Sequence, residues 1–194
     1  MTTDLTSAAT RLFQVLEHGD HVLASILVHP DFHNREAAVA PAACSTPGPA
    51  GVLASSAWMR SAFSDLRFPV LDTAGRGERV WVRLRMRGRQ TGAFVRYRDG
   101  ALDQAVPPTG REIDVEQVHV LTMRQGQVVG HEAVRDDVAM LAQLGVFPPD
   151  PVVGARVLAW KLSGRAARSA ARVSAAAAAA AAAFGHDVPG PRVT

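Results

Sequence analysis

The chain has 194 residues, of which 47% are hydrophobic and 20% are charged, and this composition excludes disorder over its whole length. Residues 1–150 hold 15 basic and 17 acidic residues, whereas residues 151–194 hold 6 basic and one acidic residue. The first part therefore carries a charge of −2 and the second +5, so the body of the protein shows no basic surface that favours nucleic acid as a partner.

The cellular setting follows from cysteine use and from the N-terminus. Cys44 is the only cysteine, which excludes an internal disulfide and favours a reducing compartment. Residues 1–13 lack a basic stretch followed by an apolar core, so we expect no signal peptide. No apolar run is long and bulky enough for a membrane span. We therefore expect a cytoplasmic protein.

The first third of the chain predicts three helices. Residues 4–17 carry apolar side chains at helical spacing, and a second helix over 20–28 ends at His29-Pro30. Asp31 to Asn34 reads as a loop or short strand, and residues 37–50 read as a loop. A third helix begins at Gly48-Pro49 and runs to Phe63, with the proline in its first turn.

From Leu66 onward the pattern changes to strands. Residues 66–73 predict an edge strand broken at Pro69, and residues 79–88 alternate strictly between apolar and polar side chains. A long loop is expected over 91–110. Strands follow over 111–123 and 127–135, and a short helix ends at Gly145.

This order, helices first and then neighbouring strands, predicts an α+β fold in which N-terminal helices pack against a curved antiparallel sheet. We expect residues 1–150 to form this domain. Residues 151–194, with nine consecutive alanines, form a basic, alanine-rich tail that is helical or partly disordered. A solvated helix, a helix resting on anionic lipid and a docking segment for a partner all remain open for the tail.

Two histidines on the paired strands are the main candidates for chemistry. A two-residue turn at Gln125-Gly126 would pair His119 with Glu132. A three-residue loop over 124–126 would instead pair His119 with His131 and Gln117 with Ala133, and we favour this register because Gln-Gly is not the usual pair for a tight turn. The inner face then carries Gln117, His119, His131, Ala133 and Arg135, with Leu121, Met123 and Val129.

Such a face suits a small-molecule site in which a histidine moves a proton. A simple polar pair across the strands is the alternative. A zinc site would need His33 or Glu132 as further ligands, and His29, Asp31 and His33 form another possible set, but neither has a usual zinc spacing, so we expect no metal. Nucleophile-elbow, P-loop and dinucleotide motifs are absent, and Cys44 has no activating partner.

The segment PPTGREIDVEQVHVLTMRQGQVVGHEAVRDDVAMLAQLG resembles the SnoaL-like polyketide cyclases of the NTF2-like superfamily. The same order of features covers about residues 8–150. The resemblance implies a cone-shaped α+β barrel and ring closure of a polyketide by aldol condensation, without metal or cofactor. It also implies a pocket lined by His119 and Gln117, with His131 as a further pocket histidine, and by Asn34, Phe32 and Trp58.

One departure from the family pattern concerns the mechanism. The residue that corresponds to Ala133 is an aspartate in the cyclases, where it is the acid–base group. Glu132 cannot replace it simply, because neighbouring strand residues point to opposite faces. We therefore expect a polyketide tailoring enzyme of secondary metabolism, such as antibiotic biosynthesis, that acts through His119 and His131.

Four alternatives follow from the same departure. They are a ring closure that needs mainly shape, a hydroxylase of the same family, a small-molecule-binding or scaffold protein that has lost the chemistry, and an NTF2-like interaction module. NTF2-like barrels commonly pair through the outer face of the sheet, so a homodimer through the face of Arg83, Arg85 and Arg87 is expected.

Overall fold

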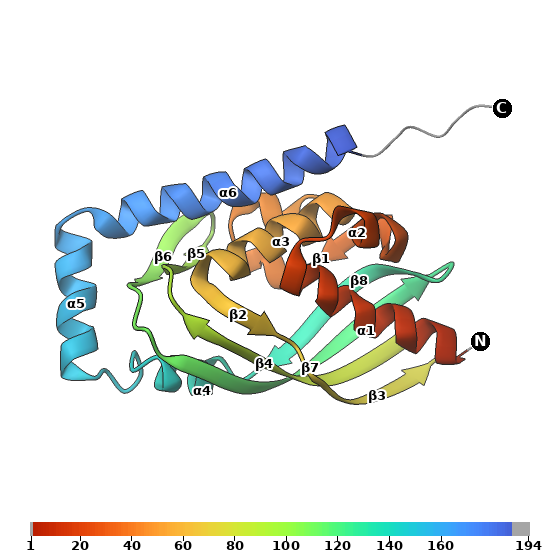
Figure 1. Ribbon diagram of the computed structural model, residues 1–194, viewed down its shortest axis with the longest axis horizontal. Coiled ribbons are helices and arrows are strands. Elements are labelled where there is room, and N and C mark those ends of the chain that lie inside the picture. The colour runs from red at the N-terminus through yellow and green to blue at the C-terminus, as the bar shows by residue number, and fades with distance from the viewer. Residues whose placement is uncertain (1, 188–194) are drawn as a thin grey trace.

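The computed structural model describes residues 2–187, including the side chains of 5–185. Helices α1 (Thr2–His18), α2 (His21–Leu27) and α3 (Pro49–Ala62) lie over the concave side of a curved sheet (Figure 1). The sheet order is β1-β8-β7-β4-β2, and β3 also pairs with β4. Its strands are β1 (Val28–Asn34), β2 (Phe63–Arg67), β3 (Val70–Arg76), β4 (Arg79–Gln90), β7 (Glu112–Arg124) and β8 (Gln127–Arg135).

The predicted α+β class is confirmed, with one change in topology. The sheet is antiparallel except at β1, which pairs in parallel with β8. Two short 3₁₀-helices, η1 (Arg35–Val39) and η2 (Ala42–Ser45), occupy half of residues 37–50, the segment expected to be a loop. They follow β1 directly, so η1 is held beside β8, and this placement matters for the site.

Strand β4 forms the centre of the core, as its alternation predicts. Val80, Val82, Leu84 and Met86 are at most 2% exposed, and β4 pairs with β7 along almost its whole length. On the outer face, three arginines form ion pairs across the strands: Arg83 with Glu116, and Arg85 and Arg87 with Asp114. The homodimer through this face stays a prediction.

The long loop expected over 91–110 is a second, two-stranded sheet. It consists of β5 (Phe94–Arg98) and β6 (Ala101–Val106), joined at Asp99-Gly100. Both turn residues have positive φ, 51° and 76°. Asp-Gly is a preferred pair for such a turn, so the sequence did contain the signal.

The PPTGR segment has a structural role in this fold. The side chain of Gln90, fully buried at the end of β4, donates to the carbonyls of Gly92, Val106 and Pro107. Its oxygen accepts from the backbone and hydroxyl of Thr109. One side chain therefore fastens both ends of the β5–β6 segment to the main sheet.

The turn between β7 and β8 differs from the predicted one. Gln125 and Gly126 both have positive φ, 52° and 83°, and form a two-residue turn that pairs Arg124 with Gln127. A register shift after the Met123–Val128 pair then places His119 opposite Ala133 and Gln117 opposite Arg135. The predicted cross-strand pairs were therefore wrong. Because of the register shift, however, the residues of β8 from His131 onward point to the side of the sheet that was predicted for them. Val128, not Val129, is the buried valine near the turn.

The C-terminal segment is helical where the structure describes it. After α4 (Asp137–Gln143), α5 (Pro151–Leu162) stands at one end of the molecule, and α6 (Arg165–Asp187) runs back along α3 (Figure 1). Small side chains make this close packing possible, since the buried face of α6 consists of Ala166, Ser169, Ala170, Val173 and Ala177. Residues 188–194 of the expected tail lie outside the described residues. No described helix is long and apolar enough to cross a membrane.

Candidate functional site

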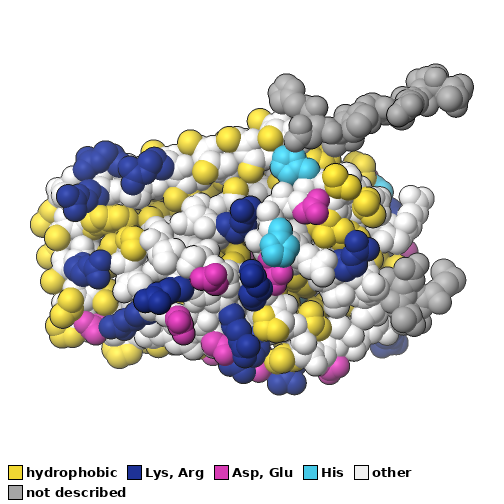
Figure 2. Space-filling model, in the orientation of Figure 1, with side chains coloured by type: hydrophobic (Ala, Val, Ile, Leu, Met, Phe, Trp, Pro, Cys, Tyr) yellow, Lys and Arg dark blue, Asp and Glu magenta, His cyan; other side chains and the backbone are white. Residues whose placement is uncertain are grey.

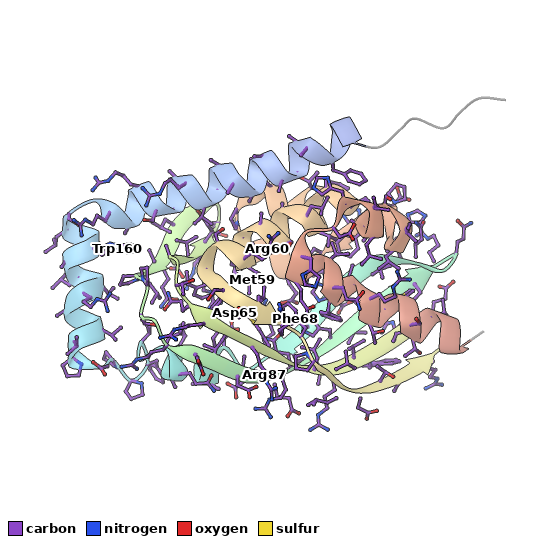
Figure 3. The ribbon with its side chains drawn as sticks, in the orientation of Figure 1. Met59, Arg60, Asp65, Phe68, Arg87 and Trp160 are labelled. Atoms are coloured by element: carbon purple, nitrogen blue, oxygen red, sulfur yellow. The ribbon has the colours of Figure 1, made fainter. Side chains whose placement is uncertain are left out.

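A cavity lies between the N-terminal helices and the inner face of the sheet. The space inside it, counted together with the open solvent at its mouth, is about 690 Å³. Most of its wall is apolar, including Phe13 of α1, Met59 of α3 and Phe68, the last two labelled in Figure 3. Its polar lining residues are Asn34, Glu36, Ser55, Gln117, His119, His131 and Arg135.

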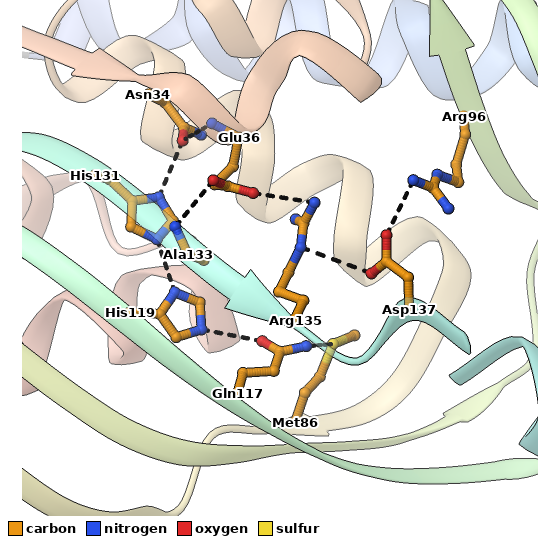
Figure 4. A network of polar contacts seen from close by, with 10 residues as sticks. All are labelled: Asn34, Glu36, Met86, Arg96, Gln117, His119, His131, Ala133, Arg135 and Asp137. Atoms are coloured by element: carbon orange, nitrogen blue, oxygen red, sulfur yellow. Dashed lines mark hydrogen bonds and ion pairs between the residues drawn. The ribbon is translucent and has the colours of Figure 1, made fainter. Parts of the chain in front are cut away.

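Four side chains from three elements form a continuous row of polar contacts (Figure 4). Asn34 Oδ1 lies 3.0 Å from His131 Nδ1, and His131 Nε2 lies 2.7 Å from His119 Nδ1. His119 Nε2 lies 3.0 Å from Gln117 Oε1. The two imidazoles are nearly coplanar, with 8° between their planes, so an N–H of one ring points at the lone pair of the other.

This row has an oxygen at each end, and that determines its proton count. Asn34 caps η1 by accepting the N–H of Glu36 at 3.1 Å, so its oxygen, not its amide nitrogen, must face His131. Three hydrogen bonds between two oxygens and four ring nitrogens require three protons. Two neutral imidazoles carry only two. With Gln117 Oε1 toward His119, the neutral pair is one proton short of satisfying the row. With the amide turned over, Gln117 Nε2 donates to His119 and the row is complete with both rings neutral.

Both histidines are neutral at physiological pH. Burial, then the charge of Arg135, lowers the pKa of His131 to about 4. Burial, then the charges of His131 and Arg135, holds the pKa of His119 well below its usual range. The pair is thus available to accept a proton, and the completed row of hydrogen bonds partly offsets the cost of a buried cation.

The lowered pKa of His131 has a consequence for stability. Because the unfolded chain binds a proton near pH 6.5 and the folded chain only near pH 4, acidification favours unfolding within this window. We expect His131 alone to cost about 2 kcal/mol of unfolding free energy between pH 7 and pH 5. Urea unfolding at both pH values measures it. Between pH 7 and pH 5, the variant His131→Gln should lose about 2 kcal/mol less unfolding free energy than the wild-type protein. An equal loss in both proteins would show that His131 does not have a lowered pKa.

A carboxylate lies beside the backbone of Ala133, the position for which the family resemblance implies an aspartate. It belongs to Glu36 of η1, whose Oε1 accepts the N–H of Ala133 at 2.9 Å (Figure 4). Glu132 does not turn inward: its side chain is 45% exposed and pairs with Arg35. Sequence reasoning missed Glu36, because it lies in an alanine- and proline-rich segment without periodicity.

Glu36 also begins a row of charges. Its Oε2 lies 3.1 Å from Arg135, which lies 3.7 Å from Asp137, and Asp137 pairs with Arg96 at 3.0 Å. Arg135 borders both the main cavity and a smaller one of about 330 Å³ toward Met140. The guanidinium is therefore held by carboxylates on two sides, between two adjoining spaces.

The structure brings seven of the eight predicted site residues to the main cavity. His119 and His131 line it with Gln117, Asn34, Phe32, Trp58 and Arg135. Trp58 is fixed by an indole N–H donated to Val95 at 3.1 Å and by stacking on Phe94. Ala133 does not line the cavity as predicted, since it meets the site only through its N–H to Glu36.

Two other sets of residues raised by the sequence lie apart from this row. Burial raises the pKa of the Cys44 thiol to about 11, so it stays protonated and is a poor nucleophile. His33 is exposed on the opposite side of β1. Among the described residues, no group of three or more His, Cys, Asp or Glu side chains is arranged to hold a metal ion.

Known structures share this fold. The candidate polyketide cyclase IdmH from Streptomyces antibioticus is 27% identical, with a TM-score of 0.55 over 73% of this chain and 99% of that one. A candidate SnoaL-like polyketide cyclase from Jannaschia sp. CCS1 is 24% identical, with a TM-score of 0.59 over 76% and 95%. The candidate hydroxylase AclR from Streptomyces galilaeus is 20% identical, with a TM-score of 0.56 over 85% and 95%.

The family assignment rests on sequence as well. No curated protein matches the chain. The family model described as SnoaL-like polyketide cyclase, however, matches residues 6–144, which span α1 to the end of α4 and every strand described above. The chain therefore belongs to the SnoaL-like polyketide cyclase family.

Proposed function

We propose that the protein closes a ring on a polyketide-like small molecule, without a cofactor, by moving a proton through His119 and His131. The observation that carries this proposal is the row from Asn34 to Gln117, in which two buried, neutral imidazoles are joined by a 2.7 Å hydrogen bond in the wall of the cavity. Intramolecular aldol closure begins with removal of a proton from the carbon beside a carbonyl. The step needs an unprotonated base within reach of the substrate, and the neutral imidazoles are unprotonated.

His119 is the base in this scheme. Its Nε2 faces Gln117, whose amide is otherwise held only by a weak contact to the Met86 sulfur at 3.7 Å, so the amide can swing aside. The carbon's proton moves to Nε2, and the enolate carbon attacks the second carbonyl of the same molecule. The proton then returns to the new alkoxide oxygen, so the reaction consumes no other reactant.

Arg135 stabilises the oxygen on which negative charge develops. It is the cationic side chain that lines the cavity, and 24% of it is exposed. Glu36 and Asp137 fix its position before the substrate enters, which makes it a preorganised group for an oxyanion. Glu36 is thus a positioning residue that acts through Arg135.

The direct test is incubation of the purified protein with linear polyketide esters, followed by chromatography and mass analysis. Ring closure is expected to give an isomer of the same mass, or the same product less one water. A gain of one oxygen would establish hydroxylation instead, and tight binding without turnover would establish a binding protein. Either of these results would contradict the proposed ring closure.

The charge of Arg135 should also be visible in the pH profile. Because that charge lowers the pKa of both histidines, the variant Arg135→Gln should move the acidic limb of kcat upward by roughly one pH unit. The variant Arg96→Gln removes a charge from the far end of the same row and should leave the limb in place. An unshifted limb in Arg135→Gln would show that the histidines do not set it.

A further inference from the structure

Helix α5 exposes an apolar stripe to solvent. Val152, Leu158 and Leu162 are 68%, 57% and 79% exposed, and Ala155 and Ala159 lie between them on the same side. Spacings of three and four residues place these five on one face of the helix. In Figure 2 hydrophobic side chains gather along this end of the molecule. Singly exposed leucines are ordinary, but a continuous stripe along one helix indicates a contact surface.

Cations border this stripe and continue onto α6. Arg156 and Lys161 lie on the two edges of the α5 stripe, and Arg165, Arg168 and Arg172 follow on α6. All five are exposed, and within the described residues none of them pairs with a carboxylate. Residues 151–186 contain no Asp or Glu at all. Figure 2 shows Lys and Arg side chains gathered where α5 meets α6.

This charge pattern indicates which of two partners, a second copy of the chain or an anionic membrane, covers the apolar stripe of α5. A second copy packed through its own α5 would bring the cations Arg156 and Lys161 of the two copies close together. Helix α5 has no acidic residue in either copy to pair with them. An anionic bilayer surface suits both features, because its headgroups attract the cations and its interface accepts the apolar side chains. The helix, roughly 18 Å long, is too short to cross a bilayer and suited to lie on one.

We infer that the corner formed by α5 and the first turns of α6, residues 151–172, docks the protein on membranes that carry anionic lipid. This inference does not depend on the proposed function. Three large apolar side chains and five cations give weak, reversible attachment, so binding should need both features and fall steeply with salt.

Sedimentation with vesicles tests the inference. Vesicles of phosphatidylcholine with 30% phosphatidylglycerol (about one anionic headgroup in three, enough for a strong surface potential) are compared with vesicles of pure phosphatidylcholine. The full-length protein should bind the anionic vesicles at low salt and the neutral ones far more weakly. The variant Lys161→Glu/Arg165→Glu should lose at least about 25-fold in affinity, at roughly fivefold for each cation. The variant Leu158→Ser/Leu162→Ser should lose on the order of tenfold.

A matched control is available at the opposite end of the molecule. Arg76 and Arg79 are exposed at the β3–β4 turn, so Arg76→Glu/Arg79→Glu makes the same charge change there. Binding should survive in this variant. Equal loss in the control, or no binding of the wild-type protein to anionic vesicles, would overturn the inference. So would a dimer, seen by light scattering, that Leu158→Ser/Leu162→Ser converts to monomer, because a second copy would then cover α5.

Discussion

The variant His119→Phe is expected to fold and to lose about a thousandfold in kcat for ring closure. Phenylalanine keeps a flat ring in the space beside Phe13, whose ring centre lies 4.9 Å from that of His119. It cannot accept a proton, and it breaks the row between His131 and Gln117. The loss of both hydrogen bonds should also cost about 2 kcal/mol of unfolding free energy, which thermal unfolding can measure.

The control for this variant is His33→Phe, which makes the same change at an exposed histidine of β1. Its kcat should equal that of the wild-type protein. Single-turnover measurements with the cyclising ester separate chemistry from product release. If His119→Phe retained turnover within threefold of wild type, the proton would have to move by another route, and Glu36 would be the next base to test.

A second large effect is expected from placing an aspartate at position 133, as the family resemblance implies there. The variant Ala133→Asp places a carboxylate on the residue whose N–H already binds Glu36. Two carboxylates in one partly buried place repel, and one must take up a proton or move. We expect a loss of about 3 kcal/mol of unfolding free energy at pH 7 and displacement of the Glu36–Arg135 pair.

A double-mutant cycle shows whether the two carboxylates compete for one place. Glu36→Gln keeps an oxygen for the N–H of Ala133 but removes the charge. Added to Ala133→Asp, it should restore at least about half of the lost stability, which urea unfolding of the four proteins would measure. Additive effects would show that the two positions are independent, and the spatial equivalence of Glu36 with the missing aspartate would be wrong.

The sequence predicted the inner face of β7 correctly because strict alternation leaves little choice over thirteen residues. Gln117, His119 and Leu121 had to share a face with the buried valines of β4. The face of β8 was predicted correctly for a less secure reason. The predicted turn was one residue longer than the real one, which moves every cross-strand pair by one residue. The register shift near Val129 moves the pairs by one further residue in the same direction. The two changes preserve which side His131 occupies but alter its cross-strand partner.

Glu36 and the β5–β6 hairpin were beyond the prediction for different reasons. Nothing local marks Glu36, since its position depends on the parallel pairing of β1 with β8, a contact between residues about 97 apart in the chain. The hairpin carried an Asp-Gly turn, but Gly100, Pro107, Pro108 and Gly110 favoured a loop over the whole segment. Glu36 was missed because a long-range strand pairing determines its position. The hairpin was missed because the pattern of its two strands is weak.

The position of Glu36 bears on how lost activity is recognised among relatives. A carboxylate can reach the wall of this cavity from a 3₁₀-helix as well as from a strand, and here Glu36 does so from η1. A comparison that inspects only position 133 would find an alanine and no acid there. Yet a carboxylate oxygen lies 2.9 Å from the backbone nitrogen of that very residue.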